Sequence, residues 1–316
     1  MTVCFARVTY FTAFAVILSA AGSLPAQIKY ASGQDVVPVF EGWERTTDGS
    51  FNMVFGYMNR NYEEEFEIPI GLNNKMEPGD GDQGQPTHFY NRRQEFVFKV
   101  KVPKDWGDKD LVWTLASRGK TEKAYGSLLP VWELGTLVYL ENRRGAGALT
   151  YPEEPNNPPS IEMVGSAQRT AAIGKPLTLS VEVTDDGYPT PRPRTRRPAV
   201  FSREGDREVA ANGPKLQSPI TQAVVKLDTD VRLGVTWVLY RGAPGTVTFE
   251  PMRVPVVSTA EGDKPTGPGP LAGNATTKVT FRQPGTYWLR AYADDGVLLT
   301  PLDVTVTVQP GVEQQE

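Results

Sequence analysis

The amino-acid sequence predicts an all-β protein composed of two β-sandwich domains. Three observations support this prediction. Apolar and polar residues alternate with a period of two in nearly every patterned segment. Glycine, proline, asparagine and aspartate separate these segments at short intervals, and no stretch keeps a period of 3.6 residues over several helical turns. The chain has 316 residues, a length at which about two domains are expected.

Three segments show the alternation most clearly: residues 94–102, 177–184 and 302–308. In the first of them Phe96, Phe98 and Val100 fall on one face. Lys99 and Lys101 fall on the other. An antiparallel sheet with one face in the core and one face in solvent has this pattern. We therefore expect Phe96 and Phe98 to point into the same core.

Shorter segments of the same character complete the predicted strands. Those of the first half are residues 37–43, 51–59, 64–70, 110–117, 120–127 and 131–140. Those of the second half are residues 161–164, 223–227, 234–240, 246–250, 277–281 and 285–293. The alternation places Trp113 and Trp237 at core positions. Short strands divided by turn residues are typical of β-sandwiches.

Residues 1–26 match a secretory signal peptide. Arg7 precedes an apolar run over residues 10–21. Small residues follow, and we expect cleavage after Ala26, with Gly22 as the alternative. The apolar run is shorter than the roughly 20 residues of a membrane span, so no membrane span is expected in the mature chain. The sequence therefore predicts export to the periplasm or the cell exterior.

Cysteine usage favours a bacterial origin for this export. Cys4 is the one cysteine of the chain, and it lies within the predicted signal peptide. The mature chain would then contain no disulfide, whereas eukaryotic secreted proteins commonly do. Its stability would come from apolar burial and backbone pairing, which two domains of ordinary size can supply.

Changes in composition divide the rest of the chain. We predict an N-terminal β-sandwich (residues 36–141), a proline-rich linker (142–159) and a second β-sandwich (160–309) with a long insertion (190–233). The prolines would make the linker semi-rigid. The insertion opens with a basic cluster made of Arg192, Arg194, Arg196 and Arg197.

Several short motifs follow one another through the second half: Asn157-Pro158-Pro159, Val183-Thr184-Asp185-Asp186-Gly187, Val235-Thr236-Trp237, Gly285-Thr286-Tyr287-Trp288 and Ala293-Asp294-Asp295-Gly296. On these motifs, residues 156–308 resemble bacterial extracellular modules of the PKD superfamily. The resemblance implies an immunoglobulin-like sandwich of about seven strands, from which the long insertion departs. It implies no particular activity. Residues 36–140 resemble no family of known function.

Composition and motifs exclude several classes of function. The 33 basic and 37 acidic side chains give no electrostatic footprint for nucleic acid, so no nucleic-acid partner is expected. A single histidine and a single cysteine exclude His-rich and Cys-based zinc sites. The sequence also contains no Walker loop, no dinucleotide fingerprint and no Gly-x-Ser-x-Gly turn.

Two groups of aspartates are candidates for calcium ligands. Asp80 and Asp82 lie in a glycine-rich loop, but the spacing of an EF-hand is not met. The second group occupies two Asp-Asp-Gly segments and comprises Asp185, Asp186, Asp294 and Asp295. These would share a calcium ion only if the two segments approached each other. Because such sequences form turns without a metal, the favoured interpretation is that no cofactor is required.

A carboxylate-dependent hydrolase is the enzymatic alternative. Its carboxylates would come from residues 63–67 or from Asp80 and Asp82, with His88 as the only imidazole of the chain. Glu65 alternates with apolar neighbours, which favours the solvated face of a strand over a desolvated pocket. His88 is expected in a loop, and a structural or surface role is favoured for it.

Aromatic and basic residues supply the candidates for ligand binding. Trp106 is expected in an exposed loop, whereas Trp288 and Tyr292 point away from the core of their strand. Exposed aromatic residues suit a sugar, a peptide or a neighbouring domain. The arginine cluster of the insertion suits an anionic partner, although an extended, solvated loop is the favoured interpretation.

We therefore predict an exported, non-enzymatic binding or scaffolding protein with a protein or glycan partner at the cell envelope. A carbohydrate-binding protein and a carboxylate-dependent hydrolase are the alternatives. The sequence leaves the ligand and the oligomeric state open.

Overall fold

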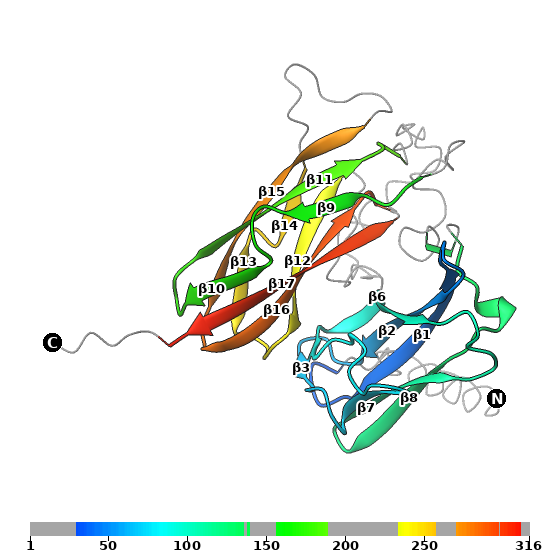
Figure 1. Cartoon of the computed structure of the whole chain (residues 1–316). Helices are drawn as coiled ribbons and strands as arrows, with labels where there is room; N and C mark the ends of the chain where they lie inside the picture. The colour runs from blue at the N-terminus through cyan, green and yellow to red at the C-terminus, as the bar shows by residue number, and fades with distance from the viewer. Residues whose placement is uncertain are drawn as a thin grey trace, which may run out of the picture.

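The computed structural model describes residues 30–135, 138–139, 156–188, 233–256, 270–296 and 298–310. The predicted signal peptide, most of the predicted linker, the strand predicted at residues 223–227 and the four arginines at 192, 194, 196 and 197 lie outside these residues. The described chain is all-β (Figure 1). We call residues 30–135 the N-terminal unit and the described residues from 156 onwards the C-terminal unit.

The N-terminal unit consists of two three-stranded antiparallel sheets and a short strand pair. The first sheet has the order β1 (Val36–Arg45), β2 (Phe51–Asn59) and β6 (Arg92–Val102). The second has the order β4 (Asn74–Glu77), β7 (Leu111–Ser117) and β8 (Lys120–Gly126). The short pair joins β3 (Phe66–Glu67) to β5 (His88–Phe89). A 3-10 helix, η1 (Pro130–Trp132), follows β8.

Aromatic residues fill the space between these sheets. Trp113 is fully buried, as the alternation predicts, and its ring lies edge-on to Phe98 with centroids 4.9 Å apart. Its indole Nε1–H donates to Asn74 Oδ1 at 3.0 Å. The amide group of Asn74 in turn donates to the carbonyls of Ile68 and Pro86. Asn74 therefore links the segments that contain Ile68 and Pro86 to Trp113 on β7, and the buried polar atoms of this core are hydrogen-bonded.

The prediction that Phe96 shares a face with Phe98 is wrong. The pairing of β2 with β6 shifts register between Phe55 and Tyr57, and Phe96 has a positive φ of 52°. Residues 95–97 of β6 lie opposite the single residue Gly56 of β2, so the strand bulges there and its regular alternation is interrupted at Phe96. Phe96 consequently packs with Val54 and Tyr139 in a separate small cluster, whereas Phe98 belongs to the main core.

The C-terminal unit is a sandwich of two larger sheets (Figure 1). The five-stranded sheet has the order β10 (Gln168–Ala172), β17 (Leu299–Gln309), β16 (Gly285–Asp294), β12 (Gly234–Arg241) and β14 (Arg253–Pro255). The four-stranded sheet has the order β13 (Val247–Glu250), β15 (Leu271–Phe281), β11 (Leu177–Asp185) and β9 (Ser160–Met163). The β10–β17 pair is parallel, and the other pairs are antiparallel.

Apolar side chains from both sheets meet between them. Trp237 is fully buried there with Leu179, Phe281 and Leu289, which confirms the core position predicted for Trp237. The burial pattern of β12 differs from that of a strand with one solvated face, because every residue from Gly234 to Tyr240 is buried. The outer face of the five-stranded sheet must therefore also be covered.

The structure changes several predicted strands. The strand expected at residues 131–140 is wrong, since η1 begins at Pro130 and Val138 and Tyr139 are helical. Proline favours the first position of a helical turn, where its missing N–H is not needed. The strand expected at residues 64–70 is reduced to β3. The short strands β4, β5, β10 and β14 were not predicted, because none of them shows a clear apolar–polar alternation in its sequence.

Candidate functional site

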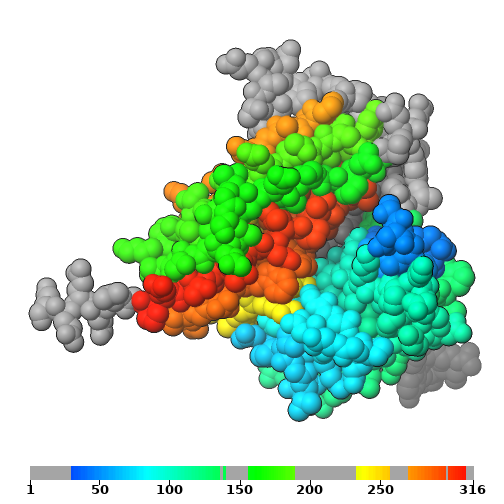
Figure 2. All heavy atoms as spheres, in the orientation of Figure 1, coloured from blue at the N-terminus to red at the C-terminus, as the bar shows by residue number. Residues whose placement is uncertain are grey.

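An extended network of polar contacts lies where the N-terminal unit covers the five-stranded sheet. Figure 2 shows the cyan segments of the N-terminal unit in contact with the yellow and orange strands of the C-terminal unit. Three positions two residues apart on β16, Trp288, Arg290 and Tyr292, share the outer face of this sheet, because alternate strand residues point to opposite sides. We call this contact region the junction.

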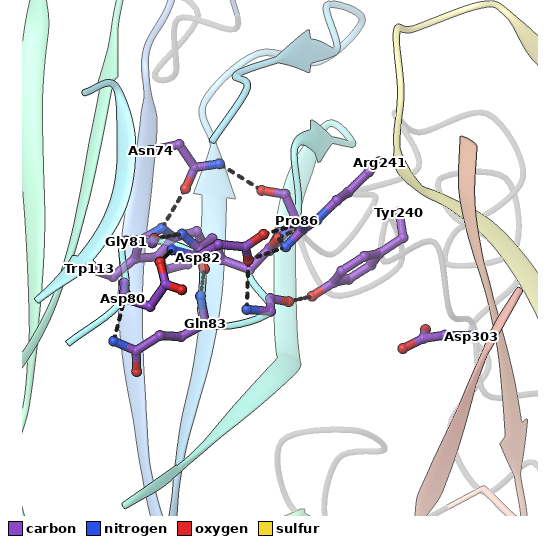
Figure 3. A network of polar contacts seen from close by, with 12 residues as sticks. Asn74, Asp80, Gly81, Asp82, Gln83, Pro86, Trp113, Tyr240, Arg241 and Asp303 are labelled. Atoms are coloured by element: carbon purple, nitrogen blue, oxygen red, sulfur yellow. Dashed lines mark hydrogen bonds and ion pairs between the residues drawn. The ribbon is translucent and has the colours of Figure 1, made fainter. Parts of the chain in front are cut away.

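Strand β12 adds two neighbouring side chains to the junction. Its pairing with β16 shifts register between Leu239 and Arg241. This bulge allows Tyr240 and Arg241 to contact the N-terminal unit together, although consecutive strand residues normally diverge. In the close view of Figure 3 both side chains reach toward the segment that contains Asp82 and Pro86.

The junction contains a stack in the order Arg241, Trp288, Tyr240 and Arg290, in which the two aromatic rings are neighbours and an arginine lies at each end. The guanidinium carbon of Arg241 lies 4.4 Å from the ring centroid of Trp288. Trp288 and Tyr240 are 5.2 Å apart between centroids, and the guanidinium carbon of Arg290 lies 3.6 Å from the Tyr240 ring. Such cation–π contacts contribute more when they are removed from water, as they are here. The stack therefore fixes the relative positions of strands β12 and β16 on this face.

Arg241 forms the main ion pair between the two units. Its two terminal nitrogens donate to both carboxylate oxygens of Asp82, at 2.8 and 2.7 Å. The same guanidinium also donates to the carbonyl oxygen of Gln85 at 3.0 and 2.8 Å. The hydrogen bonds from Arg241 hold the pKa of Asp82 below its ordinary value. This paired geometry is the strong form of an arginine–carboxylate contact.

Arg290 forms a second contact between the units. It donates to both carboxylate oxygens of Asp303 on β17, at 2.6 and 2.9 Å. It also donates to the carbonyl oxygen of Val97 on β6 at 3.1 Å, and the hydroxyl of Tyr292 donates to the same oxygen at 3.1 Å. Burial acts to lower the pKa of Arg290, but Tyr240, Tyr292 and Asp303 together outweigh burial and raise it.

Each unit packs one tyrosine against the core of the other. Tyr240 of β12 belongs to the aromatic core of the N-terminal unit, and its hydroxyl donates to the carbonyl of Gly84 at 2.6 Å. Tyr90 packs against the core of the C-terminal unit, and its hydroxyl accepts the N–H of Leu239 at 2.8 Å. Burial raises the pKa of both phenols, so both stay protonated at neutral pH. The backbone N–H of Thr87 donates to the carbonyl of Tyr240.

The structure brings His88 and Glu65 together beside the junction. His88 lies in β5 rather than in the predicted loop, and it is 2% exposed. Its Nε2 is 3.2 Å from a carboxylate oxygen of Glu65, and its ring lies edge-on to Tyr90. Glu65, predicted on the solvated face, is only 31% exposed in its side chain, whereas Glu67, the cross-strand neighbour of His88, is exposed. His88 is thus enclosed by segments that connect the two units.

The two aspartates of the glycine-rich loop have separate structural partners. Asp80 accepts the N–H of Asp82 at 3.1 Å, which closes a turn. Asp82 accepts the N–H of Gly84 and the guanidinium of Arg241. This loop is therefore the part of the N-terminal unit that meets β12.

The two Asp-Asp-Gly turns are linked by Asn156 and Asn157, which are neighbours in the chain and bind one turn each. Asn156 donates to Asp295, and Asn157 donates to Asp186 through its backbone N–H and its side chain. The carboxylate of Asp185 accepts the N–H of Gly187, and Asp294 pairs with Arg253 at 2.6 Å. Within the described part of the chain, no three His, Cys, Asp or Glu side chains are grouped as metal ligands. Protein donors thus surround these carboxylates.

The aromatic candidates are all largely withdrawn from solvent. Trp106 is 8% exposed, because its loop folds back and its Nε1–H donates to the carbonyl of Lys109 at 2.7 Å. The expected exposure of Trp106 is therefore not observed. Trp288 packs against the core of the N-terminal unit, and Tyr292 is 6% exposed. For these two residues the structure agrees with the alternative of a neighbouring domain.

Sequence reasoning did not identify Arg241, Asp303 or Tyr90 as site residues. Only one signal for them is present in the sequence. Apart from Thr236, residues 234–240 are glycine, aliphatic or aromatic, and such a nearly continuous apolar run indicates a strand covered on both faces. No sequence pattern indicates that the covering segment comes from residues 82–97.

Comparisons with known proteins find no matching protein family and no matching curated protein. Among solved structures, the N-terminal eight immunoglobulin domains of Down Syndrome Cell Adhesion Molecule are 10% identical, with a TM-score of 0.23, and the match covers 87% of this chain and 27% of that chain. Domains 4 and 5 of the S-layer protein SbsC are 10% identical, with a TM-score of 0.20, and the match covers 87% and 98% of the two chains. Titin domains Z1Z2, solved in complex with telethonin, give the same values. No helix in the described ranges has the length and hydropathy of a membrane span.

Proposed function

We propose that this chain is an exported, non-enzymatic scaffolding or binding protein of the bacterial periplasm or cell exterior. In this proposal the two β-sandwich units form one rigid body that presents its outer surfaces to a protein or glycan partner. The C-terminal unit would be a PKD-like, immunoglobulin-like module with a long insertion. The sequence of residues 1–26 supports export, because it has the three parts of a signal peptide.

The junction is the observation that carries the proposal. Inter-domain interfaces within one chain are commonly weak and polar, and relative motion is their default. Here two arginines, two exchanged tyrosines and backbone hydrogen bonds connect the units. Such contacts favour a fixed geometry, which a scaffold or spacer requires.

The state of the candidate catalytic groups supports a non-enzymatic role. A general acid needs a raised pKa, whereas Arg241 lowers the pKa of Asp82 and occupies both of its carboxylate oxygens. The pair formed by His88 and Glu65 has its imidazole enclosed at 2% exposure. A substrate would have to displace structural contacts to reach either group.

Small-angle X-ray scattering of the mature protein tests the rigid arrangement. We expect one compact distance distribution for the wild type and a broader one for an Arg241→Ala, Arg290→Ala double variant. Arg253→Ala is the matched control, because it removes an arginine–aspartate pair inside the C-terminal unit. Equal flexibility in the wild type and the double variant would contradict the proposal.

A panel of glycan and peptide substrates tests the non-enzymatic role. We expect no turnover by the mature protein. Turnover that disappears in Asp82→Asn or Glu65→Gln would favour the hydrolase alternative instead.

A further inference from the structure

A second surface lies away from the junction, around the 3-10 helix η1. Nine large apolar side chains are exposed in the described part of the chain. Three of them come from four consecutive residues: Leu129 is 58% exposed, Val131 is 82% exposed and Trp132 is 45% exposed. Scattered single exposures are normal on a protein surface, but a cluster that includes tryptophan is typical of an interaction site. We call residues 129–133 the η1 platform.

The backbone of the η1 platform is held firmly against β1. The indole Nε1–H of Trp43 donates to the carbonyl of Leu129 at 2.9 Å, and the N–H of Leu134 donates to the carbonyl of Trp43 at 2.8 Å. The ring of Trp132 lies edge-on to Phe40, with centroids 5.8 Å apart. The platform therefore presents its apolar side chains from a fixed backbone, which reduces the entropy lost on binding.

Gly42 of β1 makes this close approach feasible. It has a φ of 140°, and a Cβ atom there would lie 2.4 Å from the carbonyl oxygen of Trp132 and 2.7 Å from the side chain of Leu134. Any other residue would push the platform away from the strand. Glycine at position 42 is thus required for the η1 platform to lie this close to β1.

The edge of the η1 platform carries one charge of each sign. Arg45 is 64% exposed in its side chain and Glu133 is 39% exposed, and Arg45 Nε lies 2.8 Å from Glu133 Oε1. A strongly acidic, basic or anionic-lipid partner would favour a rim of a single sign. In a two-fold symmetric contact, by contrast, the same patch meets itself, so it must contain both members of each charge pair.

We propose that the η1 platform is the contact surface of a two-fold symmetric homodimer of this chain. Val131 and Trp132 of the two copies would form the apolar centre of the contact. Arg45 of each copy would face Glu133 of the other, exchanging the ion pair that now forms within one chain. The proposal extends the scaffolding role, because two rigid bodies joined at one end form a longer scaffold.

Sedimentation velocity over a concentration series tests this proposal. We expect wild-type protein to move from monomer to dimer as the concentration rises. Val131→Asp places a charge at the centre of the contact and should raise the dissociation constant at least about tenfold. Leu72→Asp is the matched control, because Leu72 is 88% exposed in the turn closed by Gly71 and Asn74 between β3 and β4, outside the platform. A wild-type chain that stays monomeric throughout, or a Val131→Asp dimer of unchanged affinity, would overturn the proposal.

Cysteine cross-linking gives a second, independent readout. In a full chain carrying Cys4→Ser, Val131→Cys provides the only thiol. Oxidation should yield a covalent dimer from this variant, and the corresponding Leu72→Cys protein should give markedly less. Equal cross-linking of the two variants would indicate random collision and contradict a specific contact.

The outcomes separate this proposal from the proposed function. Loss of rigidity in scattering experiments would overturn the junction argument without changing the mass of the particle. A rigid monomer would overturn the dimer alone. If Val131→Asp abolished binding of a glycan or of lipid vesicles while the wild type remained monomeric, the platform would have a different occupant and the dimer would be excluded.

Discussion

At the scale of single residues, the junction depends on properties of arginine that lysine lacks. A guanidinium group is planar, so Arg241 can lie over the ring of Trp288 and still direct two N–H groups to Asp82. Arg290 does the same between Tyr240 and Asp303. A lysine ammonium would keep the charge but would lose both the stacking and the second hydrogen bond.

We therefore predict that Arg290→Lys retains only part of the stability contributed by Arg290. Arg290→Ala should lower the free energy of unfolding by about 1–3 kcal/mol, because Asp303 remains partly hydrated after the loss. Arg290→Lys should fall between Arg290→Ala and the wild type. Urea denaturation followed by tryptophan fluorescence measures both values, and a lysine variant as stable as the wild type would contradict the role of the planar group.

Asp82 gives a prediction on acid stability. Arg241 lowers the pKa of Asp82 in the folded protein, so the folded state binds this proton less readily than the unfolded chain does. The resulting stabilisation is present above the ordinary aspartate pKa, about 3.9, and is lost as the pH falls through the folded-state value.

Asp82→Asn should therefore lose less stability than the wild type between pH 6 and pH 3. Urea denaturation at the two pH values measures the difference. Asp108→Asn, at an exposed loop position, serves as the control and should keep the acid sensitivity of the wild type.

The sequence predicts the position of a residue when that position is set by neighbours in the same strand. It does not predict positions that depend on distant segments. Trp113 and Trp237 follow from alternation within their own strands, and both are buried as predicted. Phe96 could not be placed, because the bulge that turns it away is created by the pairing of β6 with β2. Arg241 could not be identified, because its partner is 159 residues away in the chain.

At the scale of elements, irregular positions in strands place the functional surfaces. The bulge in β12 directs Tyr240 and Arg241 to the junction, and the irregularity in β1 at Gly42 makes room for the η1 platform. Regular strands would present one residue in two to each face and could do neither. The sequence predicts most of the longer strands, but it does not show where their regularity is interrupted.

Substitution of Gly42 tests this interpretation at the level of an element. Gly42→Ala combines an unfavourable positive φ with a clash against the backbone of Trp132, so we expect a loss of at least about 2 kcal/mol. Gly49→Ala is the matched control, because Gly49 also has a positive φ but a Cβ added there would meet no atom within 4 Å. Thermal unfolding should show the smaller loss for Gly49→Ala, and equal losses would mean that the clash is relieved.

At the scale of the whole molecule, the junction couples the unfolding of the two units. Tyr240 belongs to the core of the N-terminal unit and Tyr90 packs against the core of the C-terminal unit, so opening one core removes contacts from the other. Interfaces of this kind make unfolding more cooperative than in two independent domains.

Differential scanning calorimetry should consequently show one transition for the wild type. The Arg241→Ala, Arg290→Ala double variant should show two transitions, or one transition that is clearly broadened. Arg253→Ala should lower the transition temperature without dividing the transition. Two well-separated transitions in the wild type would show that the units unfold independently.

The exchange of Tyr90 and Tyr240 has a practical consequence for anyone who divides this gene. A fragment that ends near residue 141 would keep the cavity that Tyr240 normally fills, and it would expose Tyr90 to water. The complementary fragment would lose the packing of Tyr90 against its core. It would also expose Tyr240 and the rings of Trp288 and Tyr292 to water. Neither half should fold into a stable, soluble protein when produced alone. Co-expression of both halves should restore a soluble, non-covalently assembled pair.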